Sequence, residues 1–194
     1  MKIAIIAPNV SCKKNVLNNF ITTLAETTMD KEYTLIIVRN NYQGFAKAVN
    51  QGFKCALGDP EIENIILLND DVEFLEGWFD DFIEALKIFD VVGTEVNTFP
   101  THITFWAVGF KRNALEKVGL LDERFIYGEC EDLDWCARAK EEGLTFGNTL
   151  GNKISHFSGV TLRCDNDEER QKERMKNKER FREKWKGTKY ERMV

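Results

Sequence analysis

The sequence predicts an α/β fold in which a mostly parallel central sheet is flanked by helices. Apolar runs too short for helices alternate along the 194 residues with stretches whose apolar residues recur at helical spacing, which is the pattern of strand, crossover helix and strand. The short runs are rich in β-branched residues, as is typical of buried parallel strands. Because 43% of the residues are hydrophobic, the chain can fill one core, and we expect a single domain over residues 1–194.

The first half of the sequence contains three predicted strands and three predicted helices. In the first helical stretch, Val16, Phe20 and Leu24 recur on one face, which is typical of a helix that packs on a sheet. The second helix is followed by Gly58, a residue that commonly stops helices. The strands are expected over residues 2–8, 33–40 and 64–70, and the helices over residues 15–28, 45–58 and 77–89.

The second half is predicted to end in a charged helical tail. The preceding helix has acids in its first turn and Gly143 at its end, as the helix macrodipole and glycine stop signals favour. The tail carries Phe181 and Trp185 four residues apart, so we expect it to pack on its own domain or on a second copy in a homo-oligomer. The expected elements are a strand over residues 91–96, a strand or loop leading into a short helix over 101–119, a helix over 131–143, a strand and turn over 153–159, and the tail over about 166–194.

The formal net charge of −5 is unevenly distributed along the chain. From residue 170 to residue 194 there are eleven Lys or Arg and four Glu, whereas the preceding part has 16 basic and 28 acidic residues. The acidic body argues against a nonspecific grip on a nucleic-acid backbone. We interpret the basic tail as a solvated helix face, with phosphates or anionic lipid as its alternative partners.

Several features of the sequence indicate the compartment. The apolar start of the chain reaches Pro8 and Asn9 within about eight residues, which is too short for a secretory signal. No run approaches the roughly 18 apolar residues that a membrane span needs. The five cysteines are odd in number and lack Cys-x-x-Cys spacing, which indicates neither a disulfide framework nor a zinc site. We therefore expect a soluble, cytoplasmic protein.

Two acidic clusters lie where predicted elements end or begin. Asn69, Asp70 and Asp71 directly follow a buried strand, and "GECEDLD" at residues 128–134 opens a helix. A turn with a helix N-cap would explain the first cluster, and macrodipole stabilisation would explain part of the second. However, four carboxylates within six residues exceed what capping requires. Because ligands bind at the carboxyl ends of parallel strands, the clusters favour a divalent-cation site with a carboxylate as general base.

Six motifs occur in an order that is typical of one enzyme family. They are "RNNYQGFAKAVNQG", "ILLNDDVEFLEGWFDDFIEAL", "FKRNALEKVGLLDERF", "IYGECEDLDWCARAKEEGL", "ISHFSGVT" and "NKERFREKW". From about Arg39 to Trp185 the chain therefore resembles the GT-A nucleotide-sugar glycosyltransferases of glycosyltransferase family 2, especially the rhamnosyltransferase-like branch. The resemblance implies the GT-A fold, a nucleoside-diphosphate sugar as donor substrate, and Mn²⁺ or Mg²⁺ as cofactor.

The resemblance implies a metal site around the first acidic cluster. Asn69 and Asp71 match the outer positions of the family's N-x-D variant of the D-x-D motif. Asp71 is therefore expected to bind the metal, and Asp70 is the variable middle residue next to the donor. His156 matches a late histidine that contacts the metal or the diphosphate in similar enzymes. A histidine that simply satisfies its surroundings on the surface or in the core is the alternative.

The resemblance also implies a catalytic base in the second acidic cluster. Asp132, with Glu131 beside it, matches the family's pair of catalytic acids. We assign the removal of the acceptor's hydroxyl proton in an inverting transfer to Asp132, with Glu131 as the runner-up. The motif carries two extra residues around Cys130, which leaves Glu129 as a third candidate.

The nucleotide-binding half is shortened relative to the family. Members usually have a "DNxSxD" loop and a further helix and strand after the second strand, whereas this chain passes directly to "RNNYQGF". Arg39 and Lys47 could pair with phosphate, with a solvated surface position as the alternative, and Gly44 lies in the matching segment. Donor contacts are further expected from the ends of the first two strands, at Ala7, Pro8, Asn9, and Asn40 or Asn41.

These features predict a metal-dependent, inverting, hexosyltransferase-type enzyme that transfers a sugar to the hydroxyl of a glycan or another acceptor. Phe105 and Trp106 are candidates for stacking on the acceptor sugar, with core packing as the competing interpretation. Two other functions are kept as alternatives. One is a catalytically silent GT-A-like protein that binds a glycan or a partner, and the other is a glycosyltransferase that acts on modified nucleic acid. Both acidic clusters and the late histidine favour the enzyme.

Overall fold

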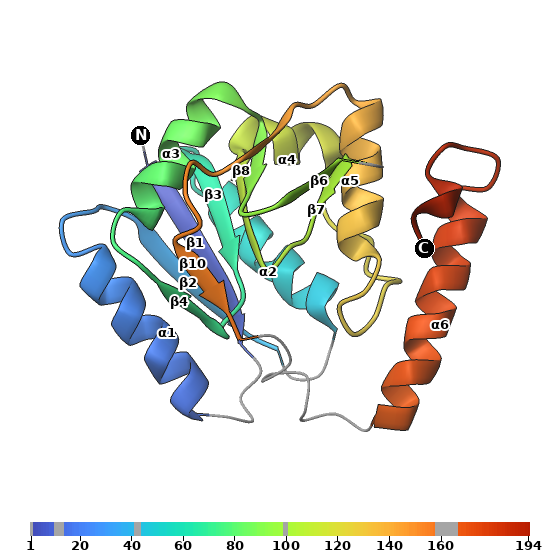
Figure 1. The fold of residues 1–194 in the computed structure, drawn as a ribbon, viewed down its shortest axis with the longest axis horizontal. Coiled ribbons are helices and arrows are strands. Elements are labelled where there is room, and N and C mark those ends of the chain that lie inside the picture. The colour runs from blue at the N-terminus through green and yellow to red at the C-terminus, as the bar shows by residue number, and fades with distance from the viewer. Residues whose placement is uncertain (1, 10–13, 41–43, 99–100, 158–166) are drawn as a thin grey trace.

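A six-stranded sheet forms the centre of the protein (Figure 1). Its strands are β1 (Lys2–Asn9), β2 (Thr34–Arg39), β3 (Ile62–Leu68), β5 (Val91–Gly93), β8 (Ala107–Lys111) and β9 (Phe146–Asn148). The computed structural model describes residues 2–9, 14–40, 44–98, 101–157 and 167–194. In the strand order β2-β1-β3-β8-β5-β9, β8 runs antiparallel to both neighbours and the other pairs are parallel. The predicted α/β fold with a mostly parallel sheet is confirmed.

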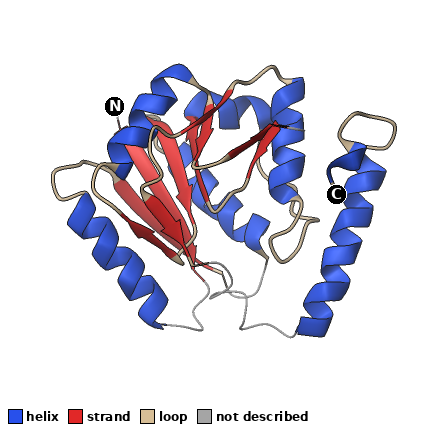
Figure 2. Cartoon of the chain, in the orientation of Figure 1, coloured by secondary structure: helices blue, strands red, loops and turns tan. Residues whose placement is uncertain are grey.

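Helices cover both faces of this sheet (Figure 2). They are α1 (Lys14–Thr27), α2 (Phe45–Leu57), α3 (Trp78–Ile88), α4 (Arg112–Val118), α5 (Glu131–Glu141) and α6 (Asp167–Lys184). Side chains of β1 alternate between two core layers, because successive residues of a strand point to opposite faces. Ala4 and Ile6 pack with residues of α2 and α5, whereas Ile3, Ile5 and Ala7 pack with residues of α1 and α3.

Two small antiparallel sheets adjoin the central one and correct the predicted strands. They pair β4 (Val72–Phe74) with β10 (Ile154–His156), and β6 (Val96–Thr98) with β7 (Thr101–Ile103). The single strand expected over residues 91–96 is wrong, because β5 and β6 belong to different sheets. Neither β4 nor β9 was predicted, because three-residue strands show little periodicity and depend on their partners. The third strand ends at Leu68, before the acids that were expected to close it.

The charged tail forms α6 and packs on its own domain. Phe181 is fully buried, and its ring centroid lies 6.5 Å from that of Phe125 and 6.4 Å from that of Trp185. Trp185 follows the last residue of α6, and its N–H donates to the carbonyl of Phe181 over 3.0 Å. In Figure 1, α6 stands beside α5 at one side of the protein. Among the described residues, no helix combines the length and apolar character that a bilayer span requires.

Candidate active site

The carboxyl ends of the first three strands bring polar residues to one edge of the sheet. Asn9 ends β1, Asn40 follows β2, and Asp70 follows β3. Nδ2 of Asn9 donates to Oδ2 of Asp70 over 2.6 Å, and the N–H of Asn40 donates to the carbonyl of Asn9 over 2.7 Å. All three residues are buried. The hydrogen bond from Asn9 therefore orients the Asp70 carboxylate and offsets part of its cost of burial.

Asp71 meets His156 because β10 pairs with β4. The pairing places His156 opposite Val72, one residue after Asp71. Nε2 of His156 lies 3.1 Å from Oδ1 of Asp71 and 3.5 Å from Nδ2 of Asn69. A backbone hydrogen bond lies next to this contact, because the N–H of Phe157 donates to the carbonyl of Asp71 over 2.9 Å. The structure thus brings together Asp71 and His156, the two predicted metal ligands, with Asn69, a predicted donor contact, beside them.

Trp106 supports this group from the side, whereas Phe105 packs in the core. The indole of Trp106 stacks on the imidazole of His156, with centroids 4.9 Å apart and planes 6° from parallel. Phe105 is buried and contacts the rings of Phe110 and Trp135. Core packing therefore accounts for Phe105, and the stacking partner of Trp106 in this structure is the histidine.

The side chains of Asp71 and His156 are within hydrogen-bond distance, and the same spacing is compatible with two adjacent ligands of one metal ion. Two ligands that sit about 2.1 Å from an octahedral ion are about 3 Å apart when they are adjacent, and the measured distance is 3.1 Å. A carboxylate oxygen and an imidazole nitrogen are also suitable donors for Mn²⁺. Within the described ranges, no three His, Cys, Asp or Glu side chains converge on one metal position. The pair therefore fits an ion that completes its coordination with ligand oxygens and water.

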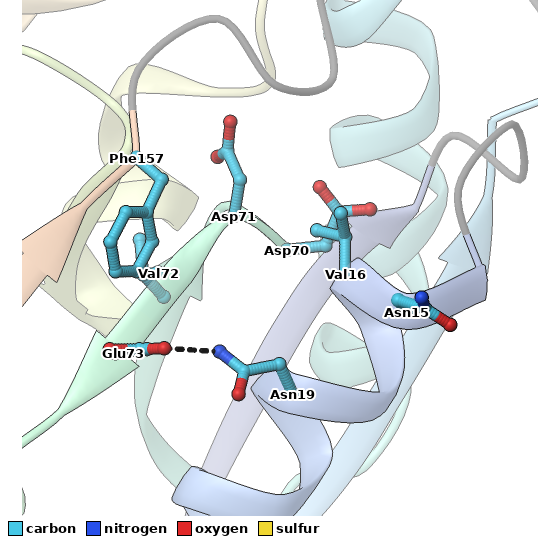
Figure 3. A pocket seen from close by; sticks show the side chains of 8 residues that line it. All are labelled: Asn15, Val16, Asn19, Asp70, Asp71, Val72, Glu73 and Phe157. Atoms are coloured by element: carbon cyan, nitrogen blue, oxygen red, sulfur yellow. Dashed lines mark hydrogen bonds between the residues drawn. The ribbon is translucent and has the colours of Figure 1, made fainter.

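A cavity of about 250 Å³ opens beside this pair, between α1 and β4 (Figure 3). Nδ2 of Asn19 donates to Oε1 of Glu73 over 2.6 Å across the cavity wall. Figure 3 shows the two aspartates pointing in different directions from the turn after β3. No sequence motif identified Asn15, Asn19 or Glu73 as cavity residues, because their proximity depends on how α1 packs against β4. The lining residues are Asn15, Val16, Asn19, Asp70, Asp71, Val72, Glu73 and Phe157.

The second acidic cluster presents two carboxyls at the start of α5. Glu131 is 3% exposed, and its Oε2 has no hydrogen-bond partner among the described residues. Burial, reinforced by the charge of Asp132, raises the pKa of Glu131 well above its ordinary value. Burial also raises the pKa of the half-buried Asp132, opposed by the N–H of Leu133, which donates to Oδ1 over 2.8 Å. Carboxyls with raised pKa values are suited to take up a proton near neutral pH.

A two-residue segment connects the two acidic clusters. The backbone N–H of Phe105 hydrogen-bonds to the Asp132 carboxyl. The carbonyl of the next residue, Trp106, accepts the N–H of Asn69 over 2.8 Å. The carboxyls of α5 and the Asp71–His156 pair therefore border the same short stretch of backbone, although they come from distant parts of the sequence.

The other acids of the second cluster are paired with basic side chains. Glu129 pairs with Arg174 of α6, whose terminal nitrogen lies 3.2 Å from Oε1. Asp134 is fully buried and pairs with Arg138 over 3.0 Å. No such Lys or Arg partner joins the two carboxyls that begin α5 in the described structure. The geometry therefore separates Glu129 from the two candidates for the base.

Gly44 places the start of α2 against the loop that precedes α5. It precedes the first residue of α2 with φ of 97°, a backbone conformation that favours glycine. A Cβ on Gly44 would lie 3.8 Å from Ile126, and a Cβ on Gly128 would lie 3.4 Å from Phe45. The first turn of α2 thus borders the loop that precedes the catalytic candidates.

The remaining candidates for donor binding are dispersed. Arg39 and Lys47 are exposed, and neither forms an ion pair with a residue that the structure describes. Pro8 is buried within β1, and Ala7 is fully buried in the core. Asn41 lies outside the described residues. The two basic side chains are thus available to solvent near the carboxyl ends of β2 and the start of α2.

Comparisons with known proteins identify the same fold. The chain is similar to the catalytic domain of Drosophila β1,4-galactosyltransferase 7 in complex with xylobiose, at 15% identity and a TM-score of 0.62, over 89% of this chain and 80% of that chain. A mutant of the same protein in complex with manganese, UDP-Gal and xylobiose gives 15% identity and a TM-score of 0.62, over 87% and 78% of the two chains. The protein A197 from STIV gives 19% identity and a TM-score of 0.53, over 81% and 86%.

The sequence comparisons supply the family. No curated protein matches the chain. The model of the family named glycosyl transferase family 2 matches residues 17–126, which is more than half of the chain. The match includes the first acidic cluster, and the structural neighbours have the GT-A fold. The chain belongs to glycosyl transferase family 2.

Proposed function

We propose that this protein is a metal-dependent, inverting glycosyltransferase that moves a sugar, of hexosyl type, from a nucleoside-diphosphate sugar to an acceptor hydroxyl. The observation that carries the proposal is the segment Phe105–Trp106, which borders a metal-ligand pair on one side and a proton-accepting carboxyl on the other. A transferase of this kind needs both groups around one donor. Family membership and the structural neighbours support the same activity.

Asp71 and His156 would hold the metal, with Asn69 beside them. A Mn²⁺ or Mg²⁺ ion at this position supplies charge neutralisation for the departing diphosphate. Asp70, oriented by Asn9, keeps a second negative charge next to the site. The structural neighbour that was solved with manganese and UDP-Gal supports this cofactor and this class of donor. The cavity beside Asp71 offers space for part of the bound substrate.

Asp132 acts as the general base in this proposal. It accepts the acceptor's hydroxyl proton while the hydroxyl oxygen bonds to the anomeric carbon, and the bond to the diphosphate breaks on the opposite face. The electron pair of the broken bond leaves with the diphosphate, so the anomeric configuration inverts. Asp132 is preferred over Glu131 because it is half-buried and reachable, whereas Glu131 is almost fully buried.

The donor's nucleotide is proposed to lie over the carboxyl ends of β1 and β2. The buried Asn9 and Asn40 shape these strand ends, and the exposed Arg39 and Lys47 offer positive charge for phosphate oxygens. Gly44 contributes by bringing the first turn of α2 to the acid-bearing loop. Pro8, buried in β1, shapes the strand end rather than exposing a polar group.

Calorimetric titration of the purified protein tests the proposal. Each nucleoside diphosphate and nucleotide sugar is added with and without Mn²⁺, and the corresponding nucleosides without phosphate serve as matched controls. We expect binding that requires both Mn²⁺ and the diphosphate and that is strongest for one base. If the folded protein bound none of the donors at millimolar concentration, the transferase proposal would be wrong and a GT-A-like binding protein would replace it.

A further inference from the structure

The loop that leads into the catalytic candidates at the start of α5 has an unusual backbone. In the acid loop, defined as residues 125–130, Tyr127, Gly128 and Cys130 have φ angles of 63°, 73° and 75°. Two of these three residues are not glycine, and such residues rarely adopt positive φ. Strained conformations of this kind persist when the surrounding structure holds them in place. The acid loop therefore requires external support to present Glu131 and Asp132 in a fixed position.

Asn177 of α6 supplies a two-point contact to this loop. It is fully buried in an otherwise highly charged helix. Its Nδ2 donates to the carbonyl of Ile126 over 2.6 Å, and its Oδ1 accepts the N–H of Ile126 over 3.3 Å. One side-chain amide thus satisfies both backbone groups of one loop residue, as a neighbouring strand would. Arg180 donates to the same Oδ1 over 2.8 Å and fixes the orientation of the amide.

Further contacts hold α6 to the two ends of the loop. Near its start, the buried rings of Phe125 and Phe181 pack together. Near its end, Glu129 pairs with Arg174. Beyond the loop, Oδ1 of Asp134 lies 2.7 Å from Nζ of Lys184. These contacts make α6 a support for the acid loop, in addition to a stabilising tail.

The loop is also bounded on the side away from Asn177. Ile126 borders Gly44, and Gly128 borders Phe45, at the start of α2. The loop therefore borders both α6 and α2, and it leads directly into Glu131 and Asp132.

We propose that Asn177 is a positioning residue of the transferase, which sets the place of Asp132 by holding the backbone of Ile126. This inference rests on the function proposed above. The side-chain hydrogen bonds of Asn177 join it to Ile126 and Arg180, and neither of these is a predicted metal-binding or catalytic residue. A small displacement of a catalytic group costs about 100-fold in rate, whereas the Asp71–His156 pair lies on other elements and keeps its geometry.

The test compares Asn177→Ala and the nearly isosteric Asn177→Asp with Met175→Ala, an exposed control position on the same helix. We expect kcat to fall by about 100-fold in Asn177→Ala and by less in Asn177→Asp. In both variants the donor KM and the metal-dependent donor affinity should stay within about twofold of wild type. The pH profile of kcat should also shift. The rate at each pH is divided by the folded fraction measured at that pH, so that a loss of folded protein does not by itself change the profile. An unchanged kcat and pH profile per folded molecule would overturn the inference.

Hydrogen exchange gives a readout that does not depend on catalysis. Asn177→Ala removes the oxygen that accepts the Ile126 N–H, so in this variant we expect the Ile126 amide to exchange at least tenfold faster than in wild type, while the amides around Phe181 keep their protection. Equal exchange at Ile126 in variant and wild type would overturn the positioning role. If the wild-type protein transferred no sugar from any donor, the proposed function would fail by itself, and the exchange measurement would still decide whether Asn177 holds the loop.

Discussion

Nε2 of His156 lies 3.1 Å from Oδ1 of Asp71, although the two residues are 85 positions apart in the chain. The contact is produced by the β4–β10 ladder, and the indole of Trp106 stacks on the imidazole. The stacking and the contact with Asp71 fix the orientation of the imidazole in this structure. The site is therefore built by three separate segments of the chain, each supplying one ring or carboxylate.

Asp71→Ala should abolish metal-dependent donor binding while the fold is retained. The substitution removes the carboxylate that lies next to His156, so one charged ligand of the ion is lost. We expect the affinity for a nucleoside diphosphate in the presence of Mn²⁺ to fall by at least 100-fold in a calorimetric titration. Glu84→Gln, at an exposed position of α3 that does not line this cavity, is the matched control and should bind as wild type does. Undiminished binding by Asp71→Ala would remove Asp71 from the metal site.

The sequence predicted those strands and helices whose own residues carry a strong local pattern. The buried run of β3 and the acidic start of α5 showed their character locally. The contact between Asn177 and Ile126 and the role of Trp106 could not be predicted, because both depend on which segments the folded chain brings together. The same reason explains why β4 and β9 were missed, since each is a three-residue strand stabilised by its partner.

Asp132→Asn should separate binding from catalysis. The amide has nearly the shape of the carboxylate but cannot accept the acceptor's proton, so we expect kcat to fall by about 10³-fold. Donor affinity should stay within about threefold, because the metal pair is untouched. Steady-state kinetics and calorimetry on the same preparation give both numbers. If Asp132→Asn kept full transfer and Glu131→Gln lost it, the base would be Glu131.

Glu131→Gln should stabilise the protein, and more so as the pH rises. Burial raises the pKa of Glu131 in the folded state, so the folded protein keeps this proton at pH values where the unfolded chain has lost it. The wild type therefore loses stability as the pH rises from the unfolded pKa toward the folded one. Glutamine does not titrate, so its advantage is small at low pH and grows toward neutral pH. Urea midpoints of both proteins at pH 5 and pH 8 measure this difference. A stability gain of Glu131→Gln at pH 8 that was equal to or smaller than its gain at pH 5 would contradict the conclusion that burial disfavours the ionised form of Glu131.

Phe181→Ala should destabilise the whole domain and thereby show that α6 folds with the rest of the protein. The side chain is fully buried between Phe125 and Trp185, and removal of such a ring costs about 3–5 kcal/mol. Met175→Ala, at an exposed position of α6 that is 57% accessible, should change stability by less than about 0.5 kcal/mol. Urea unfolding is followed by tryptophan fluorescence and by circular dichroism. A single domain predicts one transition that shifts to lower urea with both probes. A second, early transition that appears in either signal only in Phe181→Ala would instead mean that the tail unfolds separately from the sheet.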